Sequence, residues 1–168
     1  GYSDPLDEQK GVVELVNFIQ TRPEWRDTAI FIAYDDSDGW YDHAFVPPRH
    51  GSADPEVDQL DGPGQCGTAA RPEGVGGAEV NGRCGPGTRI PLLVLSPWAR
   101  TNYVSHTFLT QSSIPRFIED NWLQGERLGK GSFDADANSL EGLFDFSRKP
   151  RLDPLFLDAG TGAIKSQR

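Results

Sequence analysis

The 168-residue sequence contains no methionine, few basic residues and little apolar content. Hydrophobic residues make up 36% of the chain, and no stretch approaches the roughly 20 apolar residues that a membrane-spanning helix requires. Lys and Arg number 16 against 25 Asp and Glu, which gives a net charge of −9. Because nucleic-acid binding relies on basic contacts to phosphate, this charge disfavours it, and solubility alone accounts for the acidic balance.

The first residues lack the features of a complete N-terminus. The chain begins Gly-Tyr-Ser-Asp-Pro, without an initiator methionine and without the basic and apolar regions of a signal peptide. We therefore expect a processed chain or a fragment of a longer polypeptide. In a fragment, a missing signal peptide gives no information about where the parent protein is located.

Cysteine is scarce, and its two occurrences lie close together. Cys66 and Cys84 fall in a segment rich in glycine and polar residues that cannot build its own core. A disulfide is the simplest interpretation, and it would stabilise the fold by about 3 kcal/mol in the chain-entropy model. Such a bond implies an exported protein, either secreted or in the cell envelope. Two free thiols in a cytosolic protein are the alternative, and no second Cys/His pair has the spacing of a zinc site.

Glycine and proline are abundant and concentrate in one segment. The chain has 19 Gly and 13 Pro, and residues 47–91 hold 17 of them without any periodic pattern. The four Trp and nine Phe argue against disorder and favour a core. The length suits one domain, and we expect residues 47–91 to form a long loop and residues 160–168 a frayed tail.

The rest of the chain shows helix and strand patterns in alternation. We predict helices over residues 3–22 and 112–122, and buried strands over 28–34 and 91–96. Pro5 suits the first position of the first helix, behind a cap at Ser3 or Asp4. The first helix should bury Val12, Leu15, Val16 and Ile19, and the second Ile114, Phe117, Ile118 and Trp122. This order predicts an α/β fold, in which ligands bind at the carboxyl ends of strands.

The residues best suited to metal binding and catalysis follow the first predicted strand directly, in the sequence YDDSDGWYDH of residues 34–43. Adjacent carboxylates repel each other, and a divalent cation offsets this repulsion because hard cations prefer oxygen ligands. The cation can polarise a phosphoryl oxygen, and His43 can donate to a phosphate or protonate a leaving group. A solvated acidic turn is the alternative. An EF-hand fits poorly, because Tyr34 and Phe45 would occupy two ligand positions.

Three sequence blocks, in order, resemble the bacterial phosphoesterase family of non-specific phospholipases C and AcpA-type acid phosphatases. The central block is IAYDDSDGWYDHAFVPP. The blocks GYSDPLDEQ…IQTRPEWRDTAIFIAYDD and GPGTRIPLLVLSPWARTNYVSHTFLTQSSIPRFIEDNW precede and follow it. The resemblance covers about residues 1–125. It implies the doubly wound α/β fold of the alkaline-phosphatase-like superfamily, of which this chain would be a single C-terminal segment.

The resemblance also implies roles for individual residues. Asp35 and Asp36 match the paired acidic ligands of the catalytic metal, whose identity stays open. Asp42 and His43 match the following Asp-His at the mouth of the active site. His106 matches a later histidine, which either lines the site or makes a hydrogen bond at the start of a helix. Ser37 and Asp38 replace the common His-Gly of the family, so substrate preference stays open.

Two arginines flank the second predicted strand, Arg89 before it and Arg100 after it. Either can clamp a phosphate through two hydrogen bonds, although a salt bridge to an acidic residue is the expected role.

The family's nucleophile and its remaining metal ligands match nothing in this chain. We therefore expect them in a missing N-terminal portion, with hydrolysis of phosphate esters or phospholipids in the full-length protein only. The alternative is a non-catalytic binding domain that keeps the fold.

Overall fold

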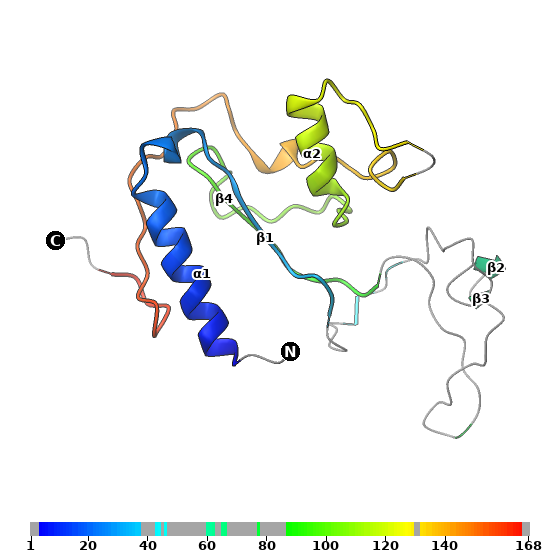
Figure 1. Ribbon diagram of the computed structural model, residues 1–168, viewed down its shortest axis with the longest axis horizontal. Coiled ribbons are helices and arrows are strands. Elements are labelled where there is room, and N and C mark those ends of the chain that lie inside the picture. The colour runs from blue at the N-terminus through cyan, green and yellow to red at the C-terminus, as the bar shows by residue number, and fades with distance from the viewer. Residues whose placement is uncertain are drawn as a thin grey trace. The chain divides into compact units, whose positions relative to one another are not determined.

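The computed structural model describes residues 4–37, 43–44, 46, 60–62, 65–66, 77, 87–129 and 132–165. The chain divides into two compact units. Unit 1 comprises Gly1–Ala33, Leu92–Leu109 and Asn138–Arg168, and unit 2 comprises Tyr34–Pro91 and Thr110–Ala137. Figure 1 shows the elements of both units.

Unit 1 contains the long helix α1, Pro5–Gln20, and the short 3-10 helix η1, Pro23–Asp27. Asp4 caps α1, because its Oδ1 accepts a hydrogen bond of 2.8 Å from the backbone N–H of Leu6. Pro5 occupies the first turn, where a missing N–H costs nothing. The predicted start and end of this helix are confirmed to within two residues.

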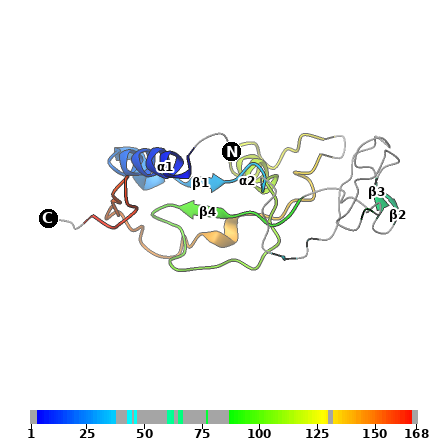
Figure 2. The same cartoon turned by 90° about the horizontal axis from the view of Figure 1, so that it is seen from below.

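The sheet of unit 1 has two strands, β1 (Ile30–Ala33) and β4 (Leu92–Leu95). They pair antiparallel, with Ile30 opposite Leu95 and Ala33 opposite Leu92, and their arrows point in opposite directions in Figure 2. Both predicted strands are confirmed, but neither is fully buried, because every residue of β1 and β4 is half-buried or exposed. The described residues therefore give a mixed α/β structure, without showing a doubly wound sheet.

The core of unit 1 forms where the residues after β4 meet the segment around the 3-10 helix η2, Glu141–Leu143. Leu140 is fully buried and Phe144 is 4% exposed. The Phe144 ring packs edge-on against Phe31 of β1, with a centroid separation of 6.2 Å. The indole N–H of Trp98 donates to the carbonyl of Arg26 at 2.9 Å. Residues far apart in sequence thus hold β1 and β4 together.

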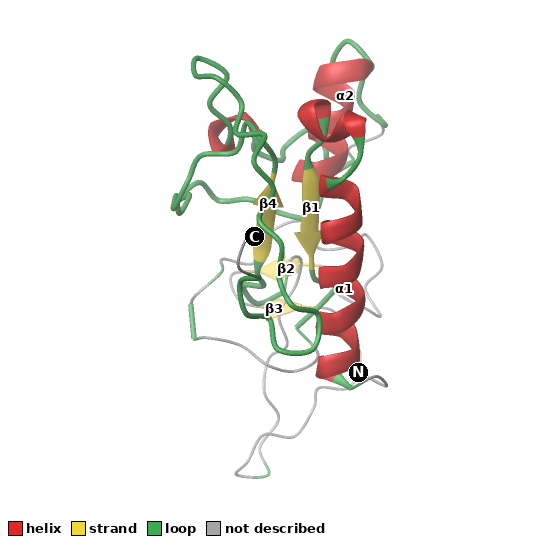
Figure 3. Cartoon of the chain, turned by 90° about the vertical axis from the view of Figure 1, so that its left-hand side faces the viewer, coloured by secondary structure: helices red, strands yellow, loops and turns green. Residues whose placement is uncertain are grey.

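The predicted apolar stripe of α1 is only partly covered. Val16 and Ile19 are half-buried, whereas Val12 is 41% and Leu15 is 58% exposed. The prediction was wrong for Val12 and Leu15 because helical periodicity identifies an apolar face but not whether another element covers it. Figure 3 shows α1 and the two-stranded sheet of this unit.

Unit 2 contains the helix α2, Ser113–Trp122, and two short antiparallel strands, β2 (Leu60–Gly62) and β3 (Gln65–Cys66). Phe117 is buried as predicted, but Ile118 and Trp122 are 47% and 68% exposed. The prediction that α2 buries Ile118 and Trp122 was therefore wrong. Cys84 and most of residues 47–91 lie outside the described part of the chain, so the disulfide stays a prediction. Among the described helices, none is long and apolar enough to cross a membrane.

Candidate functional site: the acidic turn after β1

The predicted metal ligands lie in a turn that follows β1 directly. β1 ends at Ala33, and Asp35 and Asp36 are both exposed. The backbone N–H of Asp36 donates to Oδ1 of Asp35 at 3.0 Å, which fixes one carboxylate oxygen against the turn. Carboxylate oxygens are the ligands that hard divalent cations prefer. The two side chains therefore fit a part of such a cation's ligand shell.

Two carboxylates are too few to complete the ligand shell of a metal ion. Among the described residues, no group of three or more His, Cys, Asp or Glu side chains could hold a metal ion. Asp35 and Asp36 are thus not part of a larger such group among the described residues.

Gln111 holds the backbone of this turn. Its Nε2 donates to the carbonyl of Tyr34 at 2.8 Å and to the carbonyl of Asp35 at 2.5 Å. All three residues belong to unit 2. Sequence reasoning missed Gln111, because a glutamine just before a helix carries no signal about a partner 76 residues away.

The start of α2 fixes Gln111 in turn. Ser113 is fully buried, and its hydroxyl accepts a hydrogen bond of 3.2 Å from the N–H of Thr110. The N–H of Ser113 donates to the carbonyl of Thr110 at 2.9 Å, and that of Ile114 to the carbonyl of Gln111 at 3.1 Å. Ser112 makes no side-chain capping bond. The side chain of Gln111 therefore extends from a backbone that the helix start already orders.

The remaining predicted site residues are not all brought to this turn. His43 is exposed, lies in unit 2 and has a backbone φ of 64°, a left-handed conformation that is uncommon outside glycine. Asp42 lies outside the described residues. His106 is exposed but belongs to unit 1, so its part in the site stays a prediction.

The two arginines that flank β4 belong to different units. Arg100 follows β4 and therefore lies at the end of the sheet where β1 begins. Its Nε donates to the carbonyl of Gly142 at 3.0 Å, and its guanidinium lies 5.4 Å from the ring centroid of Tyr103. Arg100 thus has a structural role, through a carbonyl and a ring. Arg89 is exposed and belongs to unit 2.

A second group of charged residues stabilises the loop after α2. Arg127 forms ion pairs with Asp120, at 2.5 Å, and with Glu119, at 3.1 Å. The hydrogen bond from Arg127 lowers the pKa of Asp120, and Arg116, one turn earlier, adds to this effect. The carboxylate of Asp134 accepts a hydrogen bond of 2.9 Å from the N–H of Leu128. The ion pairs and this hydrogen bond hold acidic residues of unit 2 in a structural network.

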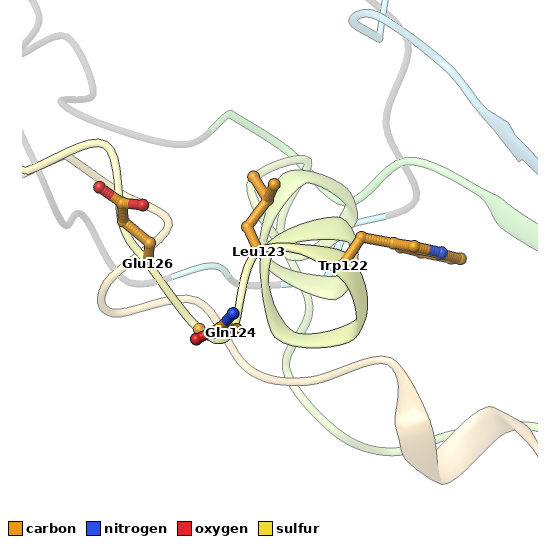
Figure 4. A pocket seen from close by; sticks show the side chains of 5 residues that line it. Trp122, Leu123, Gln124 and Glu126 are labelled. Atoms are coloured by element: carbon orange, nitrogen blue, oxygen red, sulfur yellow. The ribbon is translucent and has the colours of Figure 1, made fainter.

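A pocket of about 570 Å³ lies at the C-terminal end of α2. Five consecutive residues line it: Trp122, Leu123, Gln124, Gly125 and Glu126. Trp122 extends to one side of the helix end and Glu126 to the other (Figure 4). The predicted site residues do not line this pocket, so it does not coincide with the acidic turn.

Comparison with known proteins identifies the family. Residues 1–123 match the Phosphoesterase family. The chain is 31% identical over 136 residues to a hemolytic phospholipase C of Pseudomonas aeruginosa, an alignment that covers 80% of this chain and 17% of that protein. It is 30% identical over 109 residues to a non-hemolytic phospholipase C of Burkholderia pseudomallei, covering 64% of this chain and 15% of that protein.

A plant protein is similar over a longer stretch. The non-specific phospholipase C1 of Arabidopsis thaliana is 28% identical over 154 residues, which cover 86% of this chain and 26% of that protein. The chain therefore spans only about a quarter or less of the length of these relatives. The family match nonetheless extends over most of the chain, including β1, the acidic turn, β4 and α2. The chain belongs to the Phosphoesterase family.

Proposed function

We propose that the chain forms part of a metal-dependent phosphoesterase, of the acid phosphatase or phospholipase C type, in which Asp35 and Asp36 supply two ligands of the catalytic metal. The observation that carries this proposal is the pair of exposed, adjacent carboxylates directly after β1 in a member of the Phosphoesterase family. The relatives are phospholipases C, which supports a phospholipid or another phosphate ester as the substrate.

Each residue has a defined part in this proposal. A divalent cation, when bound, supplies Lewis-acid stabilisation of a phosphoryl oxygen. Asp35 and Asp36 hold the cation. His43 donates a proton to the phosphate or to the leaving group, with Asp42 beside it at the mouth of the site. His106 lines the site. The roles of Asp42, His43 and His106 rest on the family resemblance.

The nucleophile and the other metal ligands come from a portion of the protein N-terminal to this chain. Two observations support the existence of a further portion of the protein. The chain corresponds to only 15% and 17% of its two bacterial relatives. In addition, α1 exposes large apolar side chains that a further layer of a larger domain would cover: Leu6, Leu15 and Phe18.

Export to the cell envelope or the medium follows from the proposed disulfide between Cys66 and Cys84.

The test combines an intact mass with a phosphatase assay. The purified protein is weighed by mass spectrometry, run on a denaturing gel and assayed on an aryl phosphate, with and without a chelator. Turnover that the chelator abolishes, together with a mass well above 18.5 kDa or a co-purifying second fragment, supports the proposal. If the protein isolated from its natural source is a lone, folded chain of 18.5 kDa that hydrolyses nothing, a non-catalytic binding domain is favoured.

A further inference from the structure

We infer that Gln111 is a positioning residue for the proposed metal site, because its side-chain amide sets the conformation of the turn that presents Asp35 and Asp36. This inference rests on the proposed function. It goes further by assigning a role to a residue outside the acidic cluster, in the segment that leads into α2.

The first argument is the geometry of the two hydrogen bonds. The Nε2 atom carries two hydrogens, and it donates to the consecutive carbonyls of Tyr34 and Asp35, at 2.8 and 2.5 Å. In an extended strand, successive residues alternate in direction, so consecutive carbonyl groups point to opposite sides of the strand. Two consecutive carbonyls can converge on one nitrogen only where the chain leaves the extended conformation. The amide of Gln111 therefore defines the point at which the chain turns after β1.

The second argument is the direct connection between this turn and the carboxylates. Asp35 itself supplies one of the two carbonyls, and its Oδ1 accepts the N–H of Asp36. Releasing the carbonyl of Asp35 frees the backbone on both sides of its side chain. The relative orientation of the two carboxylates then becomes variable. Binding of a metal would have to order them, and the lost conformational entropy would weaken the metal affinity.

The third argument is chemical. Both partners of Gln111 are carbonyl oxygens, so only a donor fits at this position. Methionine has nearly the same length and volume but no N–H to donate. It would lose both bonds without adding a charge beside the two carboxylates. Substitution by methionine therefore separates hydrogen bonding from side-chain volume.

The test uses Mn²⁺ as the probe and NMR of the purified full-length protein, which carries the remaining proposed metal ligands, as the readout. Mn²⁺ broadens the resonances of nearby amides, here those of Asp35 and Asp36, so the titration reports binding without requiring turnover. We expect Gln111→Ala and Gln111→Met to need about 10-fold more Mn²⁺ than the wild type, the lower end of the usual cost of losing a residue that orients a metal ligand.

Gln20→Ala is the matched control. Gln20 also makes side-chain hydrogen bonds to backbone in unit 1, two with Leu155 and a longer one, of 3.5 Å, to the carbonyl of Val16. Gln20→Ala should titrate like the wild type, although it loses at least as many hydrogen bonds as the Gln111 variants. An unchanged Mn²⁺ titration in both Gln111 variants would overturn the inference, as would an equal loss in Gln20→Ala.

A second readout separates this inference from the proposed function. If Mn²⁺ fails to broaden Asp35 and Asp36 in the wild type, the proposed metal role fails. Hydrogen exchange at the amide of Asp36 then still tests the turn. Faster exchange in the Gln111 variants, but not in Gln20→Ala, would show that Gln111 holds the turn, and unchanged exchange would show that it does not.

Discussion

Asn17 of α1 and Leu157, 140 residues later, are joined by two reciprocal hydrogen bonds. The amide Nδ2 of Asn17 donates to the carbonyl of Leu157 at 2.8 Å, and the N–H of Leu157 donates to its Oδ1 at 3.1 Å. Gln20, one turn further along α1, makes the same pair of bonds with Leu155. Two side chains of a helix thus bind alternate residues of an extended segment, as a neighbouring strand would. The segment, coloured red in Figure 1, runs alongside α1.

Replacing Asn17 should release this C-terminal segment. Asn17→Ala removes two hydrogen bonds, each contributing about 1 kcal/mol, so we expect a loss of about 2 kcal/mol in the free energy of unfolding. Urea denaturation measures it. Lys10→Ala, on the exposed surface of the same helix, is the control and should change the stability by less than about 0.5 kcal/mol. Equal stabilities for both variants would contradict the role assigned to Asn17.

The backbone of His43 allows its side chain and its conformation to be tested separately. Because its φ is 64°, a glycine fits this position without the strain that any residue with a Cβ incurs. His43→Gly and His43→Ala both remove the imidazole, but we expect the glycine variant to be about 1 kcal/mol more stable. Thermal denaturation compares them. An alanine variant as stable as the glycine variant would show that the left-handed conformation is not maintained.

The ion pair between Asp120 and Arg127 should make the stability of the protein depend on pH in the acid range. Arg127 holds the pKa of Asp120 below its ordinary value of 3.8. A carboxyl group with a lowered pKa stabilises the folded state above 3.8, and this contribution is lost as the pH falls through the lower, folded-state pKa. Arg127→Met should therefore show a smaller loss of stability below pH 4 than the wild type. Arg151→Met, on the exposed surface, is the control. Its stability should fall as much as that of the wild type when the pH is lowered below 4.

Local signals predicted much of the secondary structure. The cap at Asp4, the proline after it and the apolar run into Ala33 act over a few residues, and the elements they predict are confirmed. Burial is different because it depends on what covers a face. Leu15 belongs to an apolar stripe but is 58% exposed.

The sequence predicted only those residues of the candidate site that are neighbours along the chain. The acidic pair of Asp35 and Asp36 stands out because strand, turn and carboxylates are contiguous in sequence. Gln111 contacts the same turn from 76 residues away. No periodicity or spacing within one sequence encodes such a contact, so a structure was required to find it.

The metal content of the purified protein tests the central claim most directly. Elemental analysis by mass spectrometry would compare the full-length wild-type protein with its variants Asp35→Asn, Asp36→Asn and the exposed control Asp153→Asn. An Asn side chain keeps the volume but removes the charge that attracts a divalent cation. We predict a stoichiometric divalent metal in the wild type and in Asp153→Asn, and its loss in the other two variants. Equal metal content in all four proteins would contradict a metal site at Asp35 and Asp36.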